Sequence, residues 1–255
     1  MKKDLVIVFD CGATNLRVIA IDGHGKIIAS ESAPNCTKPD PFNPAWRIWD
    51  VNDIWKQMCL ASRKVTAGID KSKILGATVT TFGVDGTLFD RTGQMLYPVI
   101  SWQCERTVAI MADIGKYIPL TDLYSESGVL PFTFNTINKL IWFAENKPEL
   151  IEKSHRFMFM PSIFSYFLTG EMINDTTMAG TSMASSLATR SMSGVILGKI
   201  NFPAGRFGDI AEPGTITGVV TPGASAETGL PAGVPVVATG HDTQFAIYGS
   251  GAEIN

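Results

Sequence analysis

Cysteine is scarce in this sequence, and its spacing excludes two kinds of site. The 255 residues include four cysteines. They form no CxxC pair and show no spacing typical of a zinc site. Scattered cysteines of this kind indicate free thiols in a reducing compartment, so we expect a cytoplasmic protein. The four are Cys11, Cys36, Cys59 and Cys104.

Basic clusters and long apolar runs are also missing. The net charge is −3 and no stretch is rich in Lys and Arg, which argues against binding to a nucleic-acid backbone. No apolar run reaches the length of about 18 residues that marks a membrane-spanning helix, and the first apolar run is too short for a signal peptide. We therefore expect no nucleic-acid and no membrane partner, while a homo-oligomer is compatible with the sequence.

The residues that are present predict a folded domain that opens with a β meander. Hydrophobic residues make up 45% of the chain and charged residues 18%, a balance typical of globular proteins. Short β-rich runs occur at 5–9, 16–21 and 26–32. The joint before the third run contains Asp22-Gly23, a strong hairpin signal. The first three strands are therefore expected to be antiparallel.

The rest of the chain alternates between helical and β patterns. Apolar spacing predicts helices through most of 104–170, and buried β-rich runs stand at 74–82 and 234–239. Three prolines at 37–44 predict a loop, and small polar residues at 174–186 predict an ordered loop. An opening meander followed by crossover helices and later strands indicates the α/β class.

A carboxylate stands at the tip of the first buried run. Asp10 follows "LVIVF", and "CGATN" comes next. Small residues in such a turn expose N–H groups that can cradle phosphate oxygens, and a carboxylate there can hold Mg²⁺ through water. Thr14, Asn15 and Arg17 add donors and a cation. The P-loop pattern GxxxxGK[ST] is absent, so the stretch is either a different phosphate and metal site or an ordinary turn.

Two more carboxylates follow predicted strands. Asp242, in "GHDT", lies just past a strand end, where ligands bind in open α/β sheets. It can act as a general base towards a hydroxyl or cap the helix that follows, and His241 beside it is a ligand or a loop residue. Asp85, in "TTFGVDG", lies between glycines that allow a ligand to approach closely or that mark a bulge and turn.

Two further stretches contain candidates for sugar binding. In "SWQCERT", the face of Trp102 can pack on a sugar ring and Arg106 can donate to hydroxyls. The alternative is a core tryptophan and a surface arginine. In "FNTINKL", Asn135 caps the predicted helix or faces the cleft.

The order of these motifs resembles one family. "DCGATNLR", "TTFGVDG", "SWQCERT", "FNTINKL", "DTTMAGTS" and "GHDTQFA" follow one another as in the FGGY carbohydrate kinases. That resemblance implies a ribonuclease-H-like (actin-like ATPase) lobe, with a mixed sheet, an antiparallel opening meander and flanking helices. We expect residues 1–250 to form the N-terminal sugar-binding and catalytic lobe. Residues 251–255 would begin the crossover to a second lobe, without which most of the ATP pocket and the activity would be missing.

The resemblance also implies a reaction. Asp242 would take the proton from a sugar hydroxyl, which then attacks the γ-phosphate of ATP, and Asp10 would hold Mg²⁺ through water. The substrate would be a deoxy-ketose, L-fuculose giving L-fuculose 1-phosphate, with L-rhamnulose as the alternative. A lobe that binds sugar without chemistry is the alternative of another class. Contacts to the sugar are implied for Asp85, Trp102, Asn135 and His241, and contacts to the phosphates for Thr14, Asn15 and Arg17.

Overall fold

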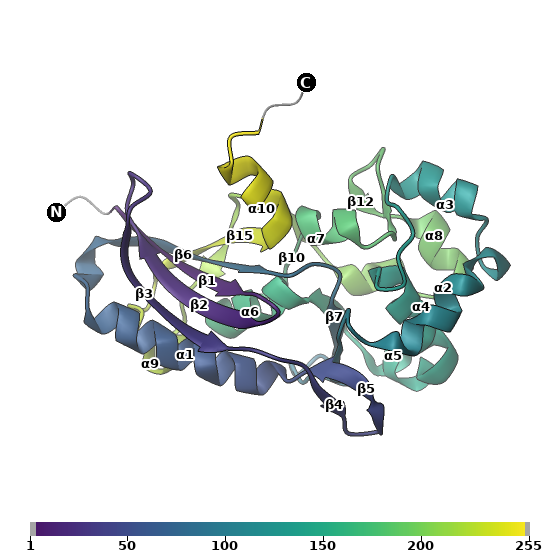
Figure 1. Cartoon of the computed structure of the whole chain (residues 1–255), viewed down its shortest axis with the longest axis horizontal. Coiled ribbons are helices and arrows are strands. Elements are labelled where there is room, and N and C mark those ends of the chain that lie inside the picture. Colours follow the sequence, from purple (N-terminus) through teal and green to yellow (C-terminus); the bar gives the residue numbers. More distant parts are fainter. Residues whose placement is uncertain (1–3, 253–255) are drawn as a thin grey trace.

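A computed structural model describes residues 4–252, and its centre is a six-stranded sheet (Figure 1). The strand order is β14-β15-β6-β1-β2-β3. The first three strands are antiparallel neighbours, which confirms the predicted meander. They are β1 (Leu5–Cys11), β2 (Asn15–Ile21) and β3 (Ile27–Pro34).

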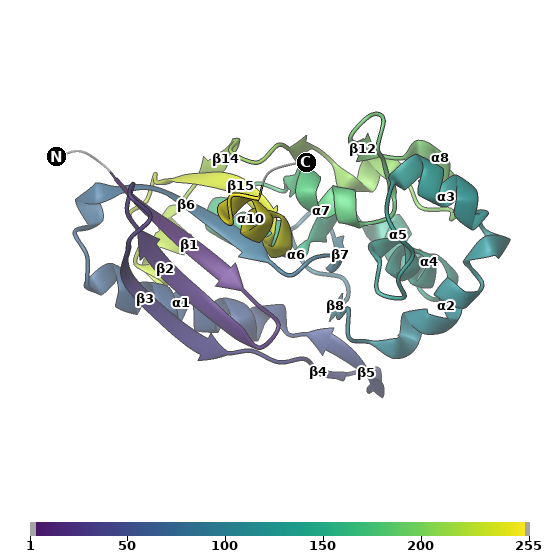
Figure 2. The ribbon, with the colours of Figure 1, turned by 45° about the horizontal axis from the view of Figure 1, so that its top comes forward.

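The other half of this sheet makes it mixed. β6 (Ile74–Thr81) runs parallel to β1, and β15 (Pro235–His241) runs parallel to β6. β14 (Ile216–Val219) is antiparallel to β15 and forms the edge. Because β1, β6 and β15 run in the same direction, their carboxyl ends meet at one edge of the sheet (Figure 2). Ligands of α/β proteins bind at such an edge.

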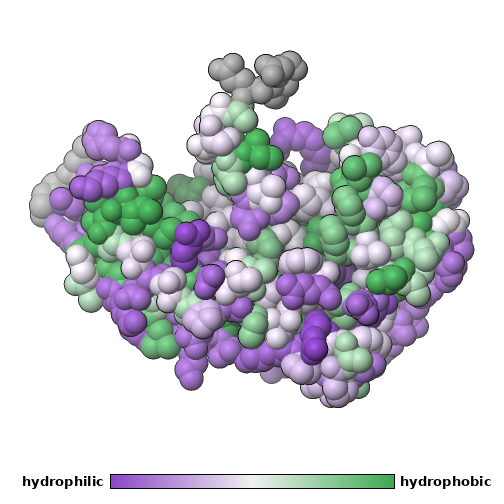
Figure 3. All heavy atoms as spheres, in the orientation of Figure 1, coloured by the Kyte–Doolittle hydropathy of each residue, from purple (hydrophilic) through white to green (hydrophobic). Residues whose placement is uncertain are grey.

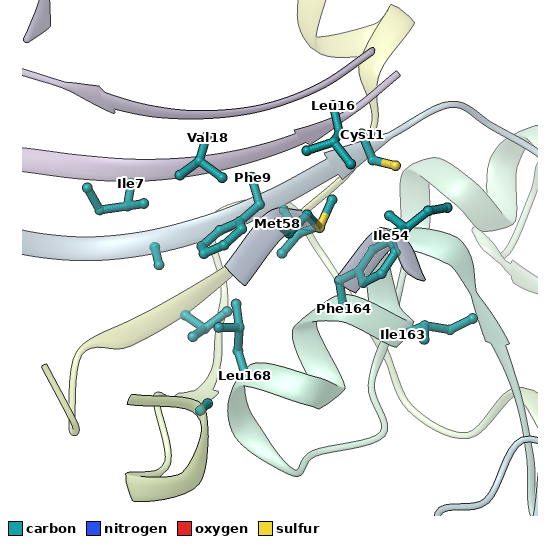
Figure 4. Packing of buried hydrophobic residues seen from close by; sticks show 14 of the residues in the cluster. Ile7, Phe9, Cys11, Leu16, Val18, Ile54, Met58, Ile163, Phe164 and Leu168 are labelled. Carbon is teal, nitrogen blue, oxygen red and sulfur yellow. The ribbon is translucent and has the colours of Figure 1, made fainter. Parts of the chain in front are cut away.

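Helices cover one face of this sheet. α1 (Val51–Ala67), α6 (Met160–Thr169) and α9 (Pro222–Thr228) lie on that face, and α10 (Asp242–Gly249) lies on the other (Figures 1 and 2). Phe9 of β1, Met58 of α1 and Phe164 of α6 meet in the layer between them (Figure 4). Fully burying a side chain of this size stabilises the fold by roughly 1.5–3 kcal/mol.

A second, mainly helical part contains a core of its own. β7 (Gly86–Phe89) pairs with β9 (Arg156–Phe159), and Figure 1 shows β7 between the large sheet and this helical part. Its helices are α2 (Val108–Ala112), α3 (Leu120–Ser127), α4 (Thr136–Asn146), α5 (Pro148–Lys153), α7 (Thr176–Thr181) and α8 (Gly194–Lys199). Short strands complete it: β10 (Asn174–Asp175) with β13 (Ile210–Ala211), and β11 (Ser185–Ser186) with β12 (Ser191–Met192).

The prediction of a loop at 37–44 is wrong, because two strands cover most of this range. β4 (Lys38–Asp40) pairs with β5 (Asn43–Trp49), which also pairs with β8 (Val99–Ile100). Pro39 is tolerated because β4 is an edge strand, and the backbone on its outer side makes no hydrogen bonds to another strand of the sheet.

The ordered loop predicted at 174–186 is also wrong, because α7 occupies its middle. Asp175 caps this helix by accepting a hydrogen bond from Met178 N at 2.9 Å. The cap overrides the weak helix propensity of the small polar residues that follow.

Two findings concern the wider organisation. Within residues 4–252, no helix is both long and apolar enough to cross a membrane. The predicted start of a crossover at 251–255 lies mostly outside the described residues and stays a prediction.

Candidate active site

The carboxyl ends of β1, β6 and β15 bring distant parts of the chain together. Asp10 of β1 is paired with Thr80 of β6, and Thr80 is paired with Gly240 of β15. Asp242 follows that strand directly as the first residue of α10. Two of the carboxylates predicted from the sequence therefore lie at the same edge of the sheet.

An open cavity of about 470 Å³ lies at this edge. Asp10, Arg17 and Asp242 all line it, so three of the predicted site residues share one space. Thr14 lies on the turn between β1 and β2, and Asn15 is the first residue of β2. Both are exposed, and neither is among the lining residues of this cavity. The complete lining is Val8, Asp10, Arg17, Ile19, Thr80, Asp242, Thr243, Phe245 and Ala246.

Asp10 and Arg17 form an ion pair across the opening hairpin. Nε and Nη2 of Arg17 donate to Oδ2 of Asp10 at 3.1 and 2.6 Å, and among the described residues Oδ1 has no hydrogen-bond partner, so it is available to another ligand. The Asp10 side chain is 18% exposed and that of Arg17 is 57% exposed. The turn between them is tight, since Gly12 N donates to Asn15 O, and a Cβ at Gly12 would come within 2.8 Å of that oxygen.

Asp242 lies at the N-terminus of α10, where the helix dipole favours a negative charge. Its Oδ1 accepts a hydrogen bond from Thr243 N at 2.6 Å, and its side chain is 39% exposed. His241, rather than Asp242, holds the N-cap position, and its side chain does not cap the helix. The capping alternative for Asp242 is therefore not what the geometry shows.

The imidazole of His241 lies close to Asp242, with 3.6 Å between Nε2 and Oδ1. Burial lowers the pKa of His241, and the negative charge of Asp242 opposes that shift. The ring approaches Gly83 so closely that a Cβ there would meet Nε2 at 2.7 Å. His241 thus packs against the loop that follows β6.

Asp85, on that loop, is completely buried. Its Oδ1 pairs with Nζ of Lys139, and its Oδ2 accepts hydrogen bonds from Trp49 Nε1 at 2.6 Å and Trp102 N at 3.0 Å. Burial raises the pKa of Asp85 and lowers that of Lys139, while the attraction between them opposes both shifts. Asp85 therefore fixes the backbone of Trp102, and its direct contact with a sugar stays a prediction.

Lys139 is a residue of the site that the sequence reasoning missed. Besides pairing with Asp85, its Nζ donates to the carbonyl oxygen of Val84 at 2.9 Å, and Thr136 Oγ1 donates to the same oxygen at 2.9 Å. Val84 has φ +65°, a region that β-branched residues rarely adopt. The two hydrogen bonds to the carbonyl oxygen of Val84 hold this strained turn beside Gly83. A lysine inside the apolar helix pattern "NTINKLIWF" was the available signal.

Trp102 and Arg106 are the reverse of the alternative of a core tryptophan and a surface arginine, because the tryptophan is partly exposed and the arginine is buried. Trp102 is 36% exposed, and its ring lies edge-on to Phe134 with 6.3 Å between centroids. Arg106 is buried, donates to Asp40 Oδ2 at 2.6 Å and lies over the ring of Trp46. The idea that Arg106 donates to sugar hydroxyls is therefore wrong, because its guanidinium is enclosed in an ion pair.

Asn135 is also buried, at the N-cap position of α4. Its side chain does not cap the helix. Instead, Oδ1 accepts from Phe132 N at 2.6 Å, and Nδ2 donates to Thr181 O at 3.4 Å. Asn135 thus shapes the loop that carries Phe132 and Phe134, and its contact with a sugar stays a prediction.

Comparison with known proteins places this geometry in a family. A profile described as "FGGY family of carbohydrate kinases, N-terminal domain" matches residues 5–249. L-fuculokinase of Escherichia coli K12 is 43% identical over 255 residues, which is 100% of this chain and 54% of that protein. L-fuculokinase of Haemophilus influenzae is 39% identical over 98% of this chain and 54% of its own length. A rhamnulokinase of Oceanobacillus iheyensis is 28% identical over 94% of this chain.

Solved structures confirm the fold. Xylulose kinase from Lactobacillus acidophilus superposes with a TM-score of 0.88 at 19% identity, over 97% of this chain and 50% of that one. Plasmodium falciparum glycerol kinase with ADP gives 0.85 at 17% identity, over 98% and 51%. The chain thus spans about half the length of the relatives it matches. It belongs to the FGGY family of carbohydrate kinases and corresponds to their N-terminal domain.

Proposed function

We propose that this chain is the sugar-binding and catalytic lobe of an ATP-dependent kinase that converts L-fuculose to L-fuculose 1-phosphate. The observation that carries the proposal is the single cavity shared by Asp10, Arg17 and Asp242. The identity to L-fuculokinases, 39–44%, supports this ketose over L-rhamnulose, because the rhamnulokinases are 28–30% identical. We place the kinase in the cytoplasm, since its four cysteines are free.

Asp242 is the general base in this proposal. Thr243 N occupies its Oδ1, so Oδ2 takes the proton of the C1 hydroxyl of the ketose. The hydrogen bond from Thr243 and the start of α10 hold the carboxylate in place before the sugar arrives. Phosphoryl transfer depends mostly on such positioning and on charge neutralisation.

Asp10 is the metal-side carboxylate. Within residues 4–252, no group of three or more His, Cys, Asp or Glu side chains could cage a metal. A single carboxylate with a free oxygen fits Mg²⁺, which keeps its waters and binds mainly through phosphates. When bound, Mg²⁺ neutralises charge on the transferred phosphate. Arg17, Thr14 and Asn15 donate to phosphate oxygens from the same hairpin.

The sugar lies between His241 and the half-exposed ring of Trp102. The apolar face of the ring packs on the sugar, while the neutral imidazole exchanges hydrogen bonds with its hydroxyls. Asp85 and Asn135 support the same sugar subsite indirectly. Asp85 anchors the backbone of Trp102, and Asn135 shapes the loop that carries Phe134.

The test of the base is Asp242→Asn in a protein that carries this chain together with the second lobe of its relatives. Loss of a general base lowers kcat by about 10²–10⁴-fold. Sugar affinity, measured by calorimetry, should change little, because the amide keeps the shape and polarity of the side chain. Asp122→Asn on α3, away from the cavity, is the control. An unchanged kcat in Asp242→Asn would contradict the assignment.

The substrate is tested separately. Initial phosphorylation rates with L-fuculose and L-rhamnulose are compared side by side at equal enzyme concentration. We expect a higher kcat/KM for L-fuculose. A higher value for L-rhamnulose would replace the substrate without touching the assignment of Asp242, and sugar binding without turnover would favour a non-catalytic lobe.

A further inference from the structure

β15 carries an irregularity just before the proposed base. Val237 pairs with Thr78 and Gly240 pairs with Thr80, so β15 has one more residue than β6 between these pairs. Gly240 has φ +139°, a value that favours glycine. Such a bulge turns the chain and redirects the side chains that follow it. The direction of Asp242 therefore depends on what holds this bulge.

The N-terminus of α7 packs directly on Gly240. A Cβ there would lie 2.1 Å from Oδ1 of Asp175 and 2.2 Å from Oγ1 of Thr177. These two oxygens belong to the second, helical part of the molecule, whereas Gly240 belongs to the central sheet. Figure 2 shows α7 beside the end of β15 where α10 begins. The bulge is thus held by side chains more than sixty residues earlier in the sequence.

Three hydrogen bonds make this contact directional. The hydroxyl of Thr177 donates to Oδ1 of Asp175 at 2.5 Å, and Met178 N donates to the same oxygen at 2.9 Å. Because the only hydroxyl proton of Thr177 points at Asp175, the oxygen lone pairs are left to accept, and His241 N donates to this oxygen at 2.9 Å. Asp175 is 4% exposed and does not line the cavity of the proposed base.

We propose that Asp175 and Thr177 are positioning residues of the kinase, which hold the Gly240–Asp242 turn so that the carboxylate of Asp242 faces the cavity. The inference rests on the proposed function, since it concerns the same base. Neither residue touches the sugar. Burial raises the pKa of Asp175 to about 6, so at neutral pH it is an ionised acceptor that fixes the direction of the Thr177 hydroxyl.

The experiment compares three substitutions on α7. Thr177→Val keeps the shape and removes the hydroxyl, while Thr177→Ser keeps the hydroxyl. Thr181→Val is the matched control, because within residues 4–252 the Thr181 hydroxyl donates only to Met178 O of the same helix. Amide hydrogen exchange at His241 is measured by NMR in the 255-residue chain. Values of kcat and KM are measured in the protein that also carries the second lobe.

In Thr177→Val we expect exchange of the His241 amide to become about five- to tenfold faster, the effect of losing one hydrogen bond. We expect kcat to fall about 10- to 100-fold without a matching rise in KM, since small misplacement of a catalytic group costs rate. Thr177→Ser should keep the parent values of both. Equal behaviour of Thr177→Val and Thr181→Val in exchange and kcat would overturn the proposal.

The two readouts separate this inference from the proposed function. If the parent protein phosphorylates no sugar, the proposed function fails, and the His241 amide still decides whether Thr177 holds the turn. If the amide responds while kcat does not, the turn is held by Thr177 but the base does not depend on it, and the positioning role is overturned.

Discussion

Asp10 lies near the carboxyl end of β1, and Asp85 lies on the loop that follows the neighbouring parallel strand β6. Each carboxylate pairs with one basic side chain. The pair of Asp10 and Arg17 is open to solvent, with side chains 18% and 57% exposed, whereas the pair of Asp85 and Lys139 is wholly buried. The Asp10 carboxylate is partly exposed and lines the cavity, and its Oδ1 has no hydrogen-bond partner within residues 4–252. The buried one has both oxygens occupied and orders the strained turn at Val84 and the backbone of Trp102. Two carboxylates near the same edge of the sheet thus differ: Asp10 lines the cavity, whereas Asp85 holds neighbouring backbone in place.

Figure 3 shows that the surface over the large sheet and the surface of the helical part differ in hydropathy. Apolar residues gather over the sheet near the N-terminus, while the helical part on the right mixes apolar and polar residues. Ile27 and Ile28 of β3 are exposed. The cavity with Asp10 lies on the sheet side, and Asp85 is enclosed where the two parts join.

The largest expected effect follows from breaking the buried pair. Lys139→Met leaves the Asp85 charge without its partner, and loss of one member of a buried pair costs about 3–5 kcal/mol of unfolding free energy. Urea unfolding of the 255-residue chain measures this. The double variant Asp85→Asn with Lys139→Met should recover part of the loss, because no uncompensated charge remains. A loss below about 1 kcal/mol would show that the pair behaves like an exposed one.

Asp175 extends the comparison of Asp10 with Asp85, because it is a buried carboxylate whose hydrogen-bond donors are neutral. Burial raises the pKa of Asp175 from 3.8 to about 6. Its contribution to the stability of the folded state is therefore complete below the unfolded-state pKa of 3.8 and is lost as the pH rises through the folded-state pKa of about 6. Asp175→Asn removes this dependence. Its stability relative to the parent should therefore rise by up to about 3 kcal/mol between about pH 4 and pH 7, measured by urea unfolding.

The control for this prediction has the opposite sign. Hydrogen bonds from Thr92 and Gln94 lower the pKa of Asp90, a partly exposed turn residue, so its contribution to stability is lost as the pH falls below about 4. Asp90→Asn should therefore lose relative stability towards neutral pH. If the difference in unfolding free energy between Asp175→Asn and the parent stayed constant between about pH 4 and pH 7, burial would not raise the pKa of Asp175.

The smallest expected effect follows from breaking the exposed pair. Arg17→Met should change the unfolding free energy by less than about 1 kcal/mol, because solvent screens a pair that is this open. The difference should shrink further at about 1 M salt, where the Debye length is about 3 Å. Urea unfolding at low and high salt, with Lys139→Met run in parallel, measures it. A loss as large as that of Lys139→Met would remove the distinction between the two pairs.

Local patterns predicted much of the fold and part of the site. The alternation in β1 to β3 and the Asp-Gly turn predicted the meander, and strand-end carboxylates predicted Asp10 and Asp242, which share a cavity. These signals succeed because a strand, its turn and its terminal residue are set by near neighbours. The role of α7 was missed because its capping residue stands among small polar residues typical of loops.

The sequence by itself determined the family, the mixed α/β architecture and the positions of the strand-end carboxylates. Only the tertiary structure decided which carboxylate faces solvent and which is enclosed. Lys139 lies 54 residues from Asp85, and Thr177 lies 64 residues from His241, so neither partner is visible in local periodicity. Burial and long-range hydrogen bonds depend on how the sheet and the helical part pack together. That packing buries Asp85 and Asp175 and leaves Asp10 and Asp242 lining the cavity.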